Sequence, residues 1–367
     1  MNTKQKKIVG IVLGVALLTI TALALYLSLG KVGEKKNSNP NRAETQEPLE
    51  VSAEPTKDPH AGMVRSRLTG KYVSSKVAKR RPYAVMINNI GYAFERQMGT
   101  SKADLIYEAL AEGGITRMLA VFEDVSGVKK IGSVRSARHY YVEFAQEWDA
   151  IFCHFGHTKY AVSKMEELNT NNLSGLSAIG GIVYARDRSI RAPHNVFTNG
   201  KKLKKGAKKQ GYSQKKDETA MAEHFQFHET DTDLPDGKKA MRITIPFSAY
   251  STCKMKYNKK SKVYMKSEYG KKHMDIYYKK QLKFKNVIIQ LVDESNIDHN
   301  GYQTMKLKKA SGKGFYYTNG KRINITWKRT ESTNEMAYYD ESGNVLTVNP
   351  GKTYIAVYPK NRKNLIK

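Results

Sequence analysis

The sequence contains little cysteine. Its 367 residues include only Cys153 and Cys253, which lie in different halves of the chain. Two cysteines cannot build the framework of a disulfide-stabilised secreted domain, although they could form one disulfide with each other. Hydrophobic residues make up 40% of the chain, and tyrosine occurs 23 times. The chain is therefore expected to fold around hydrophobic cores, and its length allows two domains.

Acidic residues are scarce as well. The chain has 34 Asp and Glu against 63 Lys and Arg, a net charge of +29 at pH 7. Residues 1–60 account for +2 of this charge, which leaves +27 on the rest. Such a charge attracts polyanions. Because no nucleic-acid-binding module is recognisable, wall polymers and lipid head groups are the expected partners; the alternative is a lysine-rich surface without a partner.

Long apolar runs are absent except near the N-terminus. Residues 8–30 contain no charged side chain, and 23 residues are enough to cross the hydrocarbon core of a membrane. Three lysines precede this run and favour a cytoplasmic N-terminus. We predict a transmembrane signal anchor at 1–30, a disordered linker at 31–65 and a folded part outside the cytoplasmic membrane. The alternative is a signal peptide with the Ala-Leu-Ala sequence at 22–24 as its cleavage site.

The common catalytic signatures are also missing. There is no nucleophile elbow, no H-E-x-x-H motif and no phosphate-binding glycine loop. His154 and His157 have the H-x-x-H spacing of some zinc sites, but two histidines alone are weak evidence, and we predict neither a metal nor a cofactor. Cys153 and His154 are neighbours on a predicted strand, so their side chains point to opposite faces and make a poor nucleophile–base pair.

The most informative segment lies between two short apolar runs, 118–122 and 151–155, which are typical of buried strands. Residues 132–138 read Gly-Ser-Val-Arg-Ser-Ala-Arg, and apolar residues then recur at helical spacing. Arg135 and Arg138 thus fall at the start of a predicted helix, where free N–H groups attract anions. We interpret this turn as an anion site; the alternative is an internal salt bridge to a nearby carboxylate.

Polar residues elsewhere are expected to complete this site. The apolar run 83–87 is a predicted strand that ends at Asn88, and such a position in an α/β fold faces a ligand or forms a turn. In the loop at 184–195, Asp187 and His194 can act as acid and base. The arginines of this loop can add to the anion site, namely Arg186, Arg188 and Arg191. The alternative is a surface loop with charge pairs.

A helix is predicted from Ser101, where the residues have the spacing of a capping box. Glu108 and Glu112 fall on the polar face of this helix, which either meets solvent or lines a cleft opposite the arginines. Arg117 begins the strand that follows.

Two further helices are expected in this half of the chain. One is predicted at 160–168, followed by a polar, glycine-rich loop at 169–181. The other lies in the run 201–216, which holds eight lysines in sixteen residues, with Leu203 and Ala207 facing inward. The lysines form either a solvated face or a contact with an acidic polymer or a membrane surface.

The second half of the chain has the alternating pattern of half-buried strands. Asn319-Gly320 separates two such strands and is the strongest two-residue signal for a hairpin, and a second hairpin is expected around 258–262. We therefore predict an α/β N-terminal domain at 66–215, with a mixed sheet flanked by helices, and a β-rich antiparallel C-terminal domain at 216–367.

Several motifs of the chain, in their order, resemble the YerB-like family of lipoproteins, whose two domains have no assigned function. They occupy residues 81–89, 112–117, 132–138, 192–195, 286–288, 326–328 and 349–354. The resemblance implies a membrane-attached, extracytoplasmic protein of Gram-positive type bacteria with an α/β and a β-rich domain, and it implies no established reaction. Two departures matter: the chain lacks a lipid-attachment cysteine after the apolar run, and Asn88 stands where the family more often has aspartate.

These observations favour a membrane-anchored, extracytoplasmic protein of the cell envelope. Its arginine-lined cleft is expected to bind an anionic ligand or partner, such as peptidoglycan, a wall polymer or another envelope protein. An arginine side chain can donate two parallel hydrogen bonds to one carboxylate or phosphate. The expected ligand-binding residues are Asn88, Glu112, Arg117, Arg135, Arg138, Asp187 and His194. The alternatives are a wall-acting hydrolase or transferase that uses Glu, Asp and His as acid and base, and a scaffold without a ligand.

Overall fold

The computed structural model describes residues 60–217, 219 and 223–367. The predicted anchor at 1–30 and most of the predicted linker at 31–65 lie outside the described residues. Among the described helices, none combines the length and the apolarity that a membrane crossing requires. Residues 58–367 form one compact unit that contains both hydrophobic cores, so this part carries what it needs to fold by itself.

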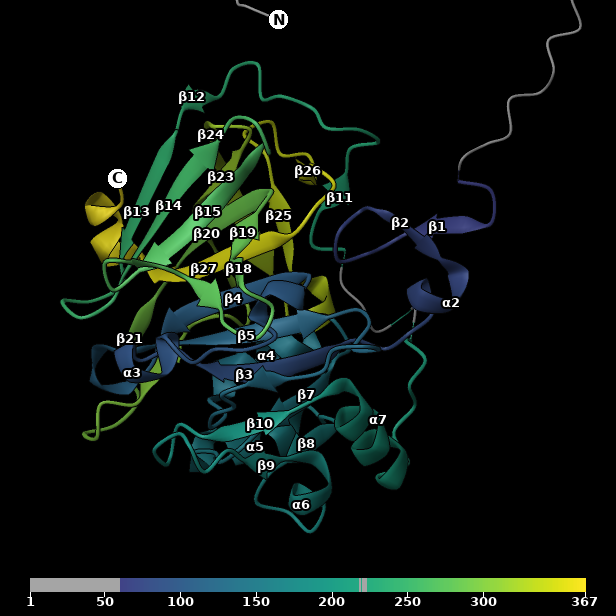
Figure 1. Cartoon of the computed structure of the whole chain (residues 1–367). Helices are drawn as coiled ribbons and strands as arrows, with labels where there is room; N and C mark the ends of the chain where they lie inside the picture. Colours follow the sequence, from purple (N-terminus) through teal and green to yellow (C-terminus); the bar gives the residue numbers. More distant parts are fainter. Residues whose placement is uncertain (1–59, 218, 220–222) are drawn as a thin grey trace, which may run out of the picture. The chain divides into compact units, whose positions relative to one another are not determined.

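One eleven-stranded sheet runs through the whole unit (Figure 1). Five of its strands come from the N-terminal half and are, in spatial order, β8 (Asn172–Ser174), β7 (Ile151–His154), β3 (Tyr83–Asn88), β5 (Thr116–Phe122) and β4 (Leu105–Leu110). The others come from the C-terminal half and are β27 (Thr353–Pro359), β20 (Asn286–Val292), β23 (Ala310–Thr318), β24 (Lys321–Arg329), β12 (Lys238–Lys239) and β25 (Ala337–Tyr339).

The two halves of the chain meet inside this sheet. Strand β27 pairs in parallel with β4, with Ile355 opposite Tyr107, and on its other side it pairs in parallel with β20. The predicted boundary at residues 215 and 216 therefore does not separate two sheets. The β-rich half is also not purely antiparallel, because β20 and β27 run in the same direction.

Both faces of the sheet are buried, which explains the continuous apolar runs of its central strands. Along β3, Tyr83, Val85 and Ile87 point into one core, whereas Ala84 and Met86 point into the other. This is the two-residue period of a strand. The predicted strands at 83–87, 118–122 and 151–155 are thus confirmed as β3, β5 and β7.

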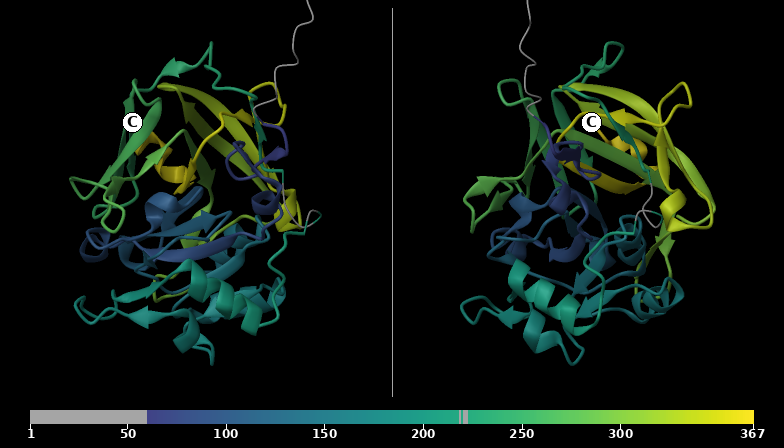
Figure 2. Two further views of the ribbon diagram at one scale, coloured as in Figure 1. Left: turned by 45° about the vertical axis from the view of Figure 1, so that its right-hand side comes forward. Right: turned by 90° about the vertical axis from the view of Figure 1, so that its right-hand side faces the viewer.

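Different layers cover the two faces (Figure 2). One face packs against α7 (Gly200–Lys209) and a small sheet, whose strands are β13 (Arg242–Pro246), β14 (Thr252–Asn258), β15 (Val263–Glu268), β16 (Lys271–Lys272) and β19 (Lys283–Phe284). The other face packs against α4 (His139–Gln146) and α5 (Lys159–Glu167), which confirms the helix predicted at 160–168. In α7, Leu203 and Ala207 are buried as predicted.

The remaining elements are short. The strands are β1 (Met63–Arg65), β2 (Tyr72–Ser74), β6 (Ile131–Gly132), β9 (Ala185–Arg186), β10 (Val196–Thr198), β11 (Gln226–Phe227), β17 (Met274–Asp275), β18 (Lys280–Gln281), β21 (Glu294–Asn296), β22 (Gln303–Met305) and β26 (Thr347–Val348). The helical turns are α2 (Ser75–Ala78), α3 (Gly91–Phe94), α6 (Gly180–Val183), η1 (Thr100–Lys102), η2 (Glu112–Gly114), η3 (Thr333–Glu335) and η4 (Lys360–Leu365). Strand β8 and the start of α6 lie inside the predicted loop 169–181, so that prediction was only partly right.

Both predicted hairpins form. Strands β23 and β24 turn at Asn319 and Gly320, whose φ angles of 49° and 74° are those that a tight hairpin turn requires. Strands β14 and β15 pair around the second predicted turn.

The helix predicted from Ser101 is wrong. A single turn, η1, occupies 100–102, and residues 105–110 form β4 instead. A short segment with five apolar residues among six fits a buried strand as well as a helix, and here pairing with β5 and β27 decides the outcome. Glu108 consequently lies in the middle of the sheet, fully buried, rather than on a polar helix face.

Candidate functional site

The candidate site lies at the carboxyl ends of β3 and β7, which are parallel neighbours. The segment 133–137 fits between these ends. The Arg135 N–H donates to the Met86 carbonyl of β3 over 3.1 Å, and the Phe155 N–H, just after β7, donates to the Arg135 carbonyl over 3.1 Å. Ligands of open α/β sheets bind outside the carboxyl ends of strands, so the backbone presents Arg135 at a favourable place.

The structure brings together Asn88, Arg135 and His194, three of the residues predicted for the site. Asn88 Nδ2 lies 2.8 Å from His194 Nδ1. Because an amide nitrogen only donates, Nδ1 accepts, and the neutral imidazole carries its proton on Nε2. The Arg135 Nη1 lies 3.5 Å from the carbonyl oxygen of Pro193, directly before the histidine.

Two more arginines gather around His194. The guanidinium groups of Arg96 and Arg191 lie over the Tyr92 ring, at 3.9 and 5.2 Å from its centroid, and this ring is 5.3 Å from the imidazole. Burial, and then the charges of Arg135, Arg191 and Arg96, lower the pKa of His194. The imidazole is therefore neutral at pH 7. Sequence analysis had included Arg191 but missed Tyr92 and Arg96, whose four-residue spacing around α3 was the available signal.

These three arginines differ from Arg117 and Arg138 in having no bonded carboxylate among the described residues, although the charge of Glu112 also acts on Arg135. In the part of the chain that the structure describes, no carboxylate forms an ion pair with Arg96, Arg135 or Arg191. We call these arginines, together with Tyr92 and His194, the arginine site.

Arg117 and Arg138 have a different environment. Glu112 joins them: its Oε1 lies 2.7 Å from Arg117 Nη2, and its Oε2 accepts from Arg138 Nε over 2.8 Å. Although burial opposes ionisation, the two guanidinium groups lower the pKa of Glu112. For these two arginines the structure thus has the internal salt bridge that sequence analysis left open. Arg138 lies at the N-cap of α4, whereas Arg135 precedes the helix by four residues.

The carboxylate of Asp187 bonds groups other than His194. It accepts from the Ser189 hydroxyl over 2.6 Å and from Lys130 over 2.9 Å, and these contacts lower the pKa of Asp187 to about 2. Asp187 therefore stays ionised and bonded at neutral pH, so it is poorly placed to serve as an acid or base beside the imidazole.

His154 and Cys153, which sequence analysis considered as a metal ligand and a nucleophile, are buried, and the histidine is also hydrogen-bonded within the protein. Burial lowers the pKa of His154 to about 4, and its ring nitrogens bond the Gly156 carbonyl and Asn172. Burial also raises the pKa of the Cys153 thiol. Within residues 60–217, 219 and 223–367, no three His, Cys, Asp or Glu side chains are grouped closely enough to hold a metal ion.

Behind the arginine site lies a buried polar network that sequence analysis missed. Lys266 Nζ lies 2.5 Å from Glu268 Oε2 and 3.1 Å from Glu108 Oε2, and all three side chains are fully buried. Burial and the neighbouring Glu268 raise the pKa of Glu108 to about 7. Asn89, next to Asn88, donates to both carboxylates. Because Glu108 is on β4 and the other two are on β15, the network fastens the two halves of the chain to each other.

Comparison with known proteins gives consistent results. Residues 68–213 match the family described as "Protein of unknown function (DUF3048) N-terminal domain", and residues 243–355 match its C-terminal domain. The chain is 32% identical over 302 residues to "Putative lipoprotein YerB" of Bacillus subtilis (strain 168), covering 82% of this chain and 87% of that protein. The crystal structure of the YerB protein from Bacillus subtilis superposes with a TM-score of 0.73 at 30% identity, covering 83% of this chain and 99% of that one. The chain therefore belongs to the DUF3048 family, as its resemblance to the YerB-like proteins predicted.

Proposed function

We propose that this protein is held at the outer face of the cytoplasmic membrane and binds an anionic group of the cell envelope at the arginine site. Two observations support the location: the relative in Bacillus subtilis is named a lipoprotein, and residues 8–30 form an uncharged apolar run. The single observation that carries the binding role is the group of three guanidinium groups around His194, none of which forms an ion pair with a carboxylate of the described residues.

The arginine site is suited to a carboxylate. The charges of all three arginines act on His194, and two of the guanidinium groups lie over the same Tyr92 ring, so an anionic ligand beside the imidazole would be attracted by them. A guanidinium group can donate two parallel hydrogen bonds to a carboxylate, and Nε2 of the neutral His194 supplies one more donor. We infer that the ligand is a carboxylate-bearing fragment of peptidoglycan, which has such groups on its short peptides.

The geometry supports binding better than acid–base catalysis. A hydrolase of this site would need a carboxylate close to His194. Of the two carboxylates predicted for the site, Glu112 is bonded to Arg117 and Arg138, and Asp187 is bonded to Lys130. In a pure scaffold these arginines would serve only to contact Tyr92 and the Pro193 carbonyl, which does not require three positive charges.

The proposal is tested by calorimetric titration of the fragment 58–367 with a soluble disaccharide peptide of peptidoglycan at about 150 mM salt. The variant Arg135→Gln/Arg191→Gln is expected to bind at least about tenfold more weakly, because it loses charge-assisted hydrogen bonds of about 1.5–3 kcal/mol each. The control Arg242→Gln/Lys254→Gln removes the same charge from exposed residues of β13 and β14 and is expected to bind like the parent.

A second readout follows His194 itself. An anion next to the ring stabilises the imidazolium, so the pKa of His194, which is lowered in the free protein, should rise when the ligand binds. This rise is measurable by NMR titration of the ring protons. Equal weakening in both variants, or binding that leaves the His194 titration unchanged, would argue against the arginine site.

A further inference from the structure

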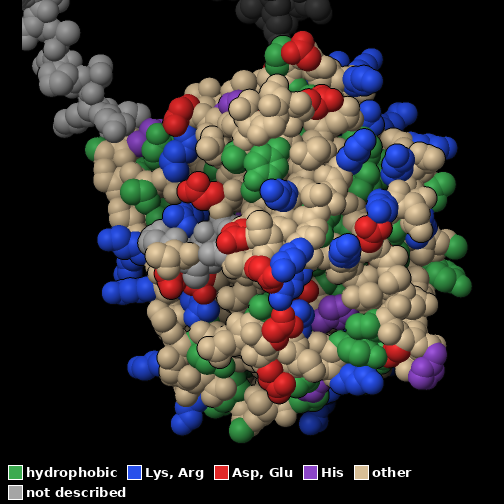
Figure 3. All heavy atoms as spheres, turned by 180° about the vertical axis from the view of Figure 1, so that it is seen from behind, with side chains coloured by type: hydrophobic (Ala, Val, Ile, Leu, Met, Phe, Trp, Pro, Cys, Tyr) green, Lys and Arg blue, Asp and Glu red, His purple; other side chains and the backbone are tan. Residues whose placement is uncertain are grey.

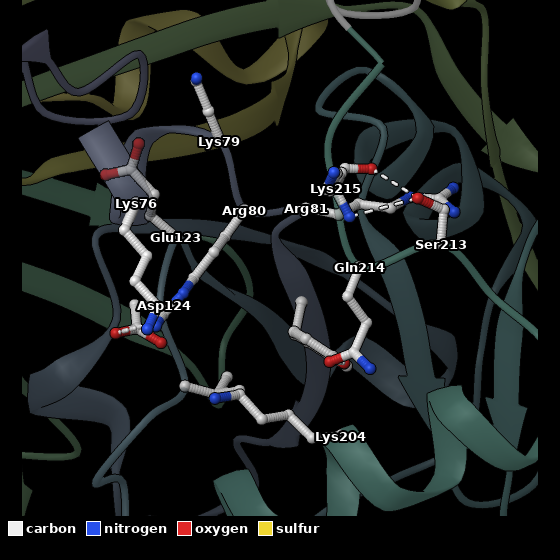
Figure 4. Close-up of a pocket in the computed structure, with 12 residues that line it drawn as sticks. Lys76, Lys79, Arg80, Arg81, Glu123, Asp124, Lys204, Ser213, Gln214 and Lys215 are labelled. Carbon is white, nitrogen blue, oxygen red and sulfur yellow. Dashed lines mark hydrogen bonds and ion pairs between the residues drawn. The ribbon is translucent and has the colours of Figure 1, made fainter. Parts of the chain in front are cut away.

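A second basic region lies at the other end of β3. It is a cavity of about 600 Å³ between α2, α7 and the segment 213–215 (Figure 4). Tyr83, the first residue of β3, lines it, whereas Asn88 at the last position belongs to the surroundings of the arginine site. At about 3.3 Å per residue, β3 separates the two regions by roughly 16 Å.

Backbone pairing holds the walls of this cavity in place. The Arg81 N–H donates to the Gln214 carbonyl over 2.9 Å, and the Lys216 N–H donates to the Lys79 carbonyl over 3.2 Å. The segment before β3 and the segment after α7 are thus fastened side by side, and Arg80 and Lys215 form a bridge between them. The cavity is therefore a fixed feature of the fold rather than a gap between two loops.

Six basic side chains line the cavity, and the protein neutralises only two of them. Arg80 pairs with Asp124, and Arg81 pairs with Asp149 over 2.7 Å. The other four are lysines that have no carboxylate partner among the described residues, namely Lys76, Lys79, Lys204 and Lys215. We call them the cavity lysines.

The one further acid in the cavity does little to balance this charge. Burial raises the pKa of Glu123 to about 7, so this side chain is only partly ionised at neutral pH. In Figure 4 the side chains of Lys76 and Lys204 come from opposite sides, one from α2 and one from α7. The Lys79 side chain extends away from these two in the same view, toward the rim. Ammonium groups that have no carboxylate partner among the described residues attract an anion into the hollow.

Positive charge is more concentrated at the cavity than on the face shown in Figure 3. On the face shown in Figure 3, basic side chains are spread widely, with acidic ones between them. At the cavity the charge continues onto the exposed side of α7, through Lys201, Lys205, Lys208 and Lys209. A basic surface of this extent can meet several negative groups of one molecule.

We propose that the cavity lysines bind phosphodiester groups of an anionic polymer outside the membrane. The ammonium group of lysine is a compact point charge that suits phosphate, whereas the planar guanidinium groups of the arginine site suit a paired carboxylate. A flexible polymer can place one phosphate in the hollow and the next along α7, while a flat lipid layer reaches only its rim. Ser213 and Gln214 at the cavity can bond the hydroxyl groups of a polyol chain.

The test is fluorescence anisotropy with a labelled poly(glycerol phosphate) oligomer and the fragment 58–367, at about 50 mM and about 150 mM salt. One variant carries Gln at all four cavity lysines. The control Lys254→Gln/Lys256→Gln/Lys259→Gln/Lys260→Gln removes the same charge from exposed positions on β14 and its hairpin turn. Melting temperatures of both variants establish that they are folded.

We expect the cavity variant to bind the oligomer at least about tenfold more weakly than the parent and the control to stay within about threefold, because local ion pairs rather than net charge hold the polymer. Equal losses in the two variants, or no binding by the parent, would overturn the proposal. The proposal would also be overturned if anionic phospholipid vesicles bound the parent more tightly than the oligomer does and bound the cavity variant more weakly, since the ligand would then be the membrane.

This inference does not depend on the proposed function. The arginine-site variant Arg135→Gln/Arg191→Gln is expected to bind poly(glycerol phosphate) within about threefold of the parent, because the two regions lie at opposite ends of β3. The two proposals can therefore fail separately.

Discussion

Replacing Lys266 by methionine tests how the two halves of the chain are fastened together. The substitution keeps an unbranched side chain in the core but leaves Glu108 and Glu268 without the cation that they share. All three side chains are fully buried, so no water can take over the role of the ammonium group. Removing one partner of a buried ion pair typically costs about 3–5 kcal/mol of stability.

The acid–base equilibrium gives a second estimate of this cost. Without Lys266, the least unfavourable response of a buried carboxylate is to bind a proton. For a carboxyl group with an ordinary pKa of 4.5, protonation at pH 7 costs about 3.4 kcal/mol. In the parent, burial and the neighbouring Glu268 already raise the pKa of Glu108 to about 7, and the substitution leaves Glu268 as a second buried carboxylate without its cation, in agreement with the range above.

The pH dependence of the variant follows from the same equilibrium. In Lys266→Met the pKa of Glu108, which burial and Glu268 already raise to about 7, is expected to rise further without the ammonium group, so the folded protein binds more protons than the unfolded chain. Stability is then lost as pH rises from about 4.5 and regained as it falls. The deficit of the variant relative to the parent should therefore be about 3–5 kcal/mol at pH 7 and clearly smaller at pH 5.

The assay is urea denaturation of the fragment 58–367 at pH 5 and pH 7. The triple variant Glu108→Gln/Lys266→Met/Glu268→Gln, which removes all three charges, should recover part of the loss, and Lys283→Met, at an exposed position of β19, should change little. A deficit below about 1 kcal/mol at pH 7 would refute the reasoning, because the carboxylates would then not depend on the lysine. A deficit of equal size at both pH values would show that packing rather than charge was lost.

Three further outcomes are expected, each measured by denaturation of the same fragment. Glu112→Gln should cost about 2–4 kcal/mol, because it leaves two buried arginines without their carboxylate, while Glu95→Gln, at an exposed pair, should have little effect. His154→Gln should make stability less dependent on pH. Because the pKa of His154 is lowered to about 4, the folded parent binds fewer protons than its unfolded chain between pH 6.5 and 4. The parent therefore loses up to about 3 kcal/mol of stability as pH falls through this range, and the variant does not. Gly200→Ala should cost about 1–3 kcal/mol, since its Cβ would lie 1.8 Å from a backbone carbonyl, whereas Gly181→Ala meets open space and should be neutral.

The elements that could be predicted are those whose pattern is local. Strand β3 is a continuous apolar run, helix α7 has a helical periodicity, and the turn at Asn319-Gly320 consists of residues that accept positive φ. None of these needs knowledge of a distant partner. Strand β4 does need it, because its neighbour β27 lies almost 250 residues later, and a mostly apolar segment of six residues does not by itself decide between helix and strand.

The candidate site shows the same division. Asn88, Arg135 and His194 could be grouped from sequence because strand ends in an α/β sheet face the same edge. Which arginine keeps a free guanidinium group could not be predicted, since that depends on the position of one carboxylate, Glu112. Lys266 was not recognisable as a core residue at all, because burial of a lysine is rare and here depends on Glu108, which lies on a distant strand, as well as on its neighbour Glu268.

The two basic regions differ in chemistry, and this difference has a measurable consequence. At the arginine site Arg96 and Arg191 lie over the Tyr92 ring, next to a buried histidine, so part of their interaction with a ligand is directional. The cavity lysines attract mainly through charge, which mobile ions screen over about 8 Å at 0.15 M salt. Raising salt from about 50 to 150 mM should therefore weaken poly(glycerol phosphate) binding several-fold and peptide-fragment binding much less. If both ligands lost affinity in the same proportion, the arginine site would act as a second patch of general positive charge, and its proposed preference for a carboxylate would have no basis.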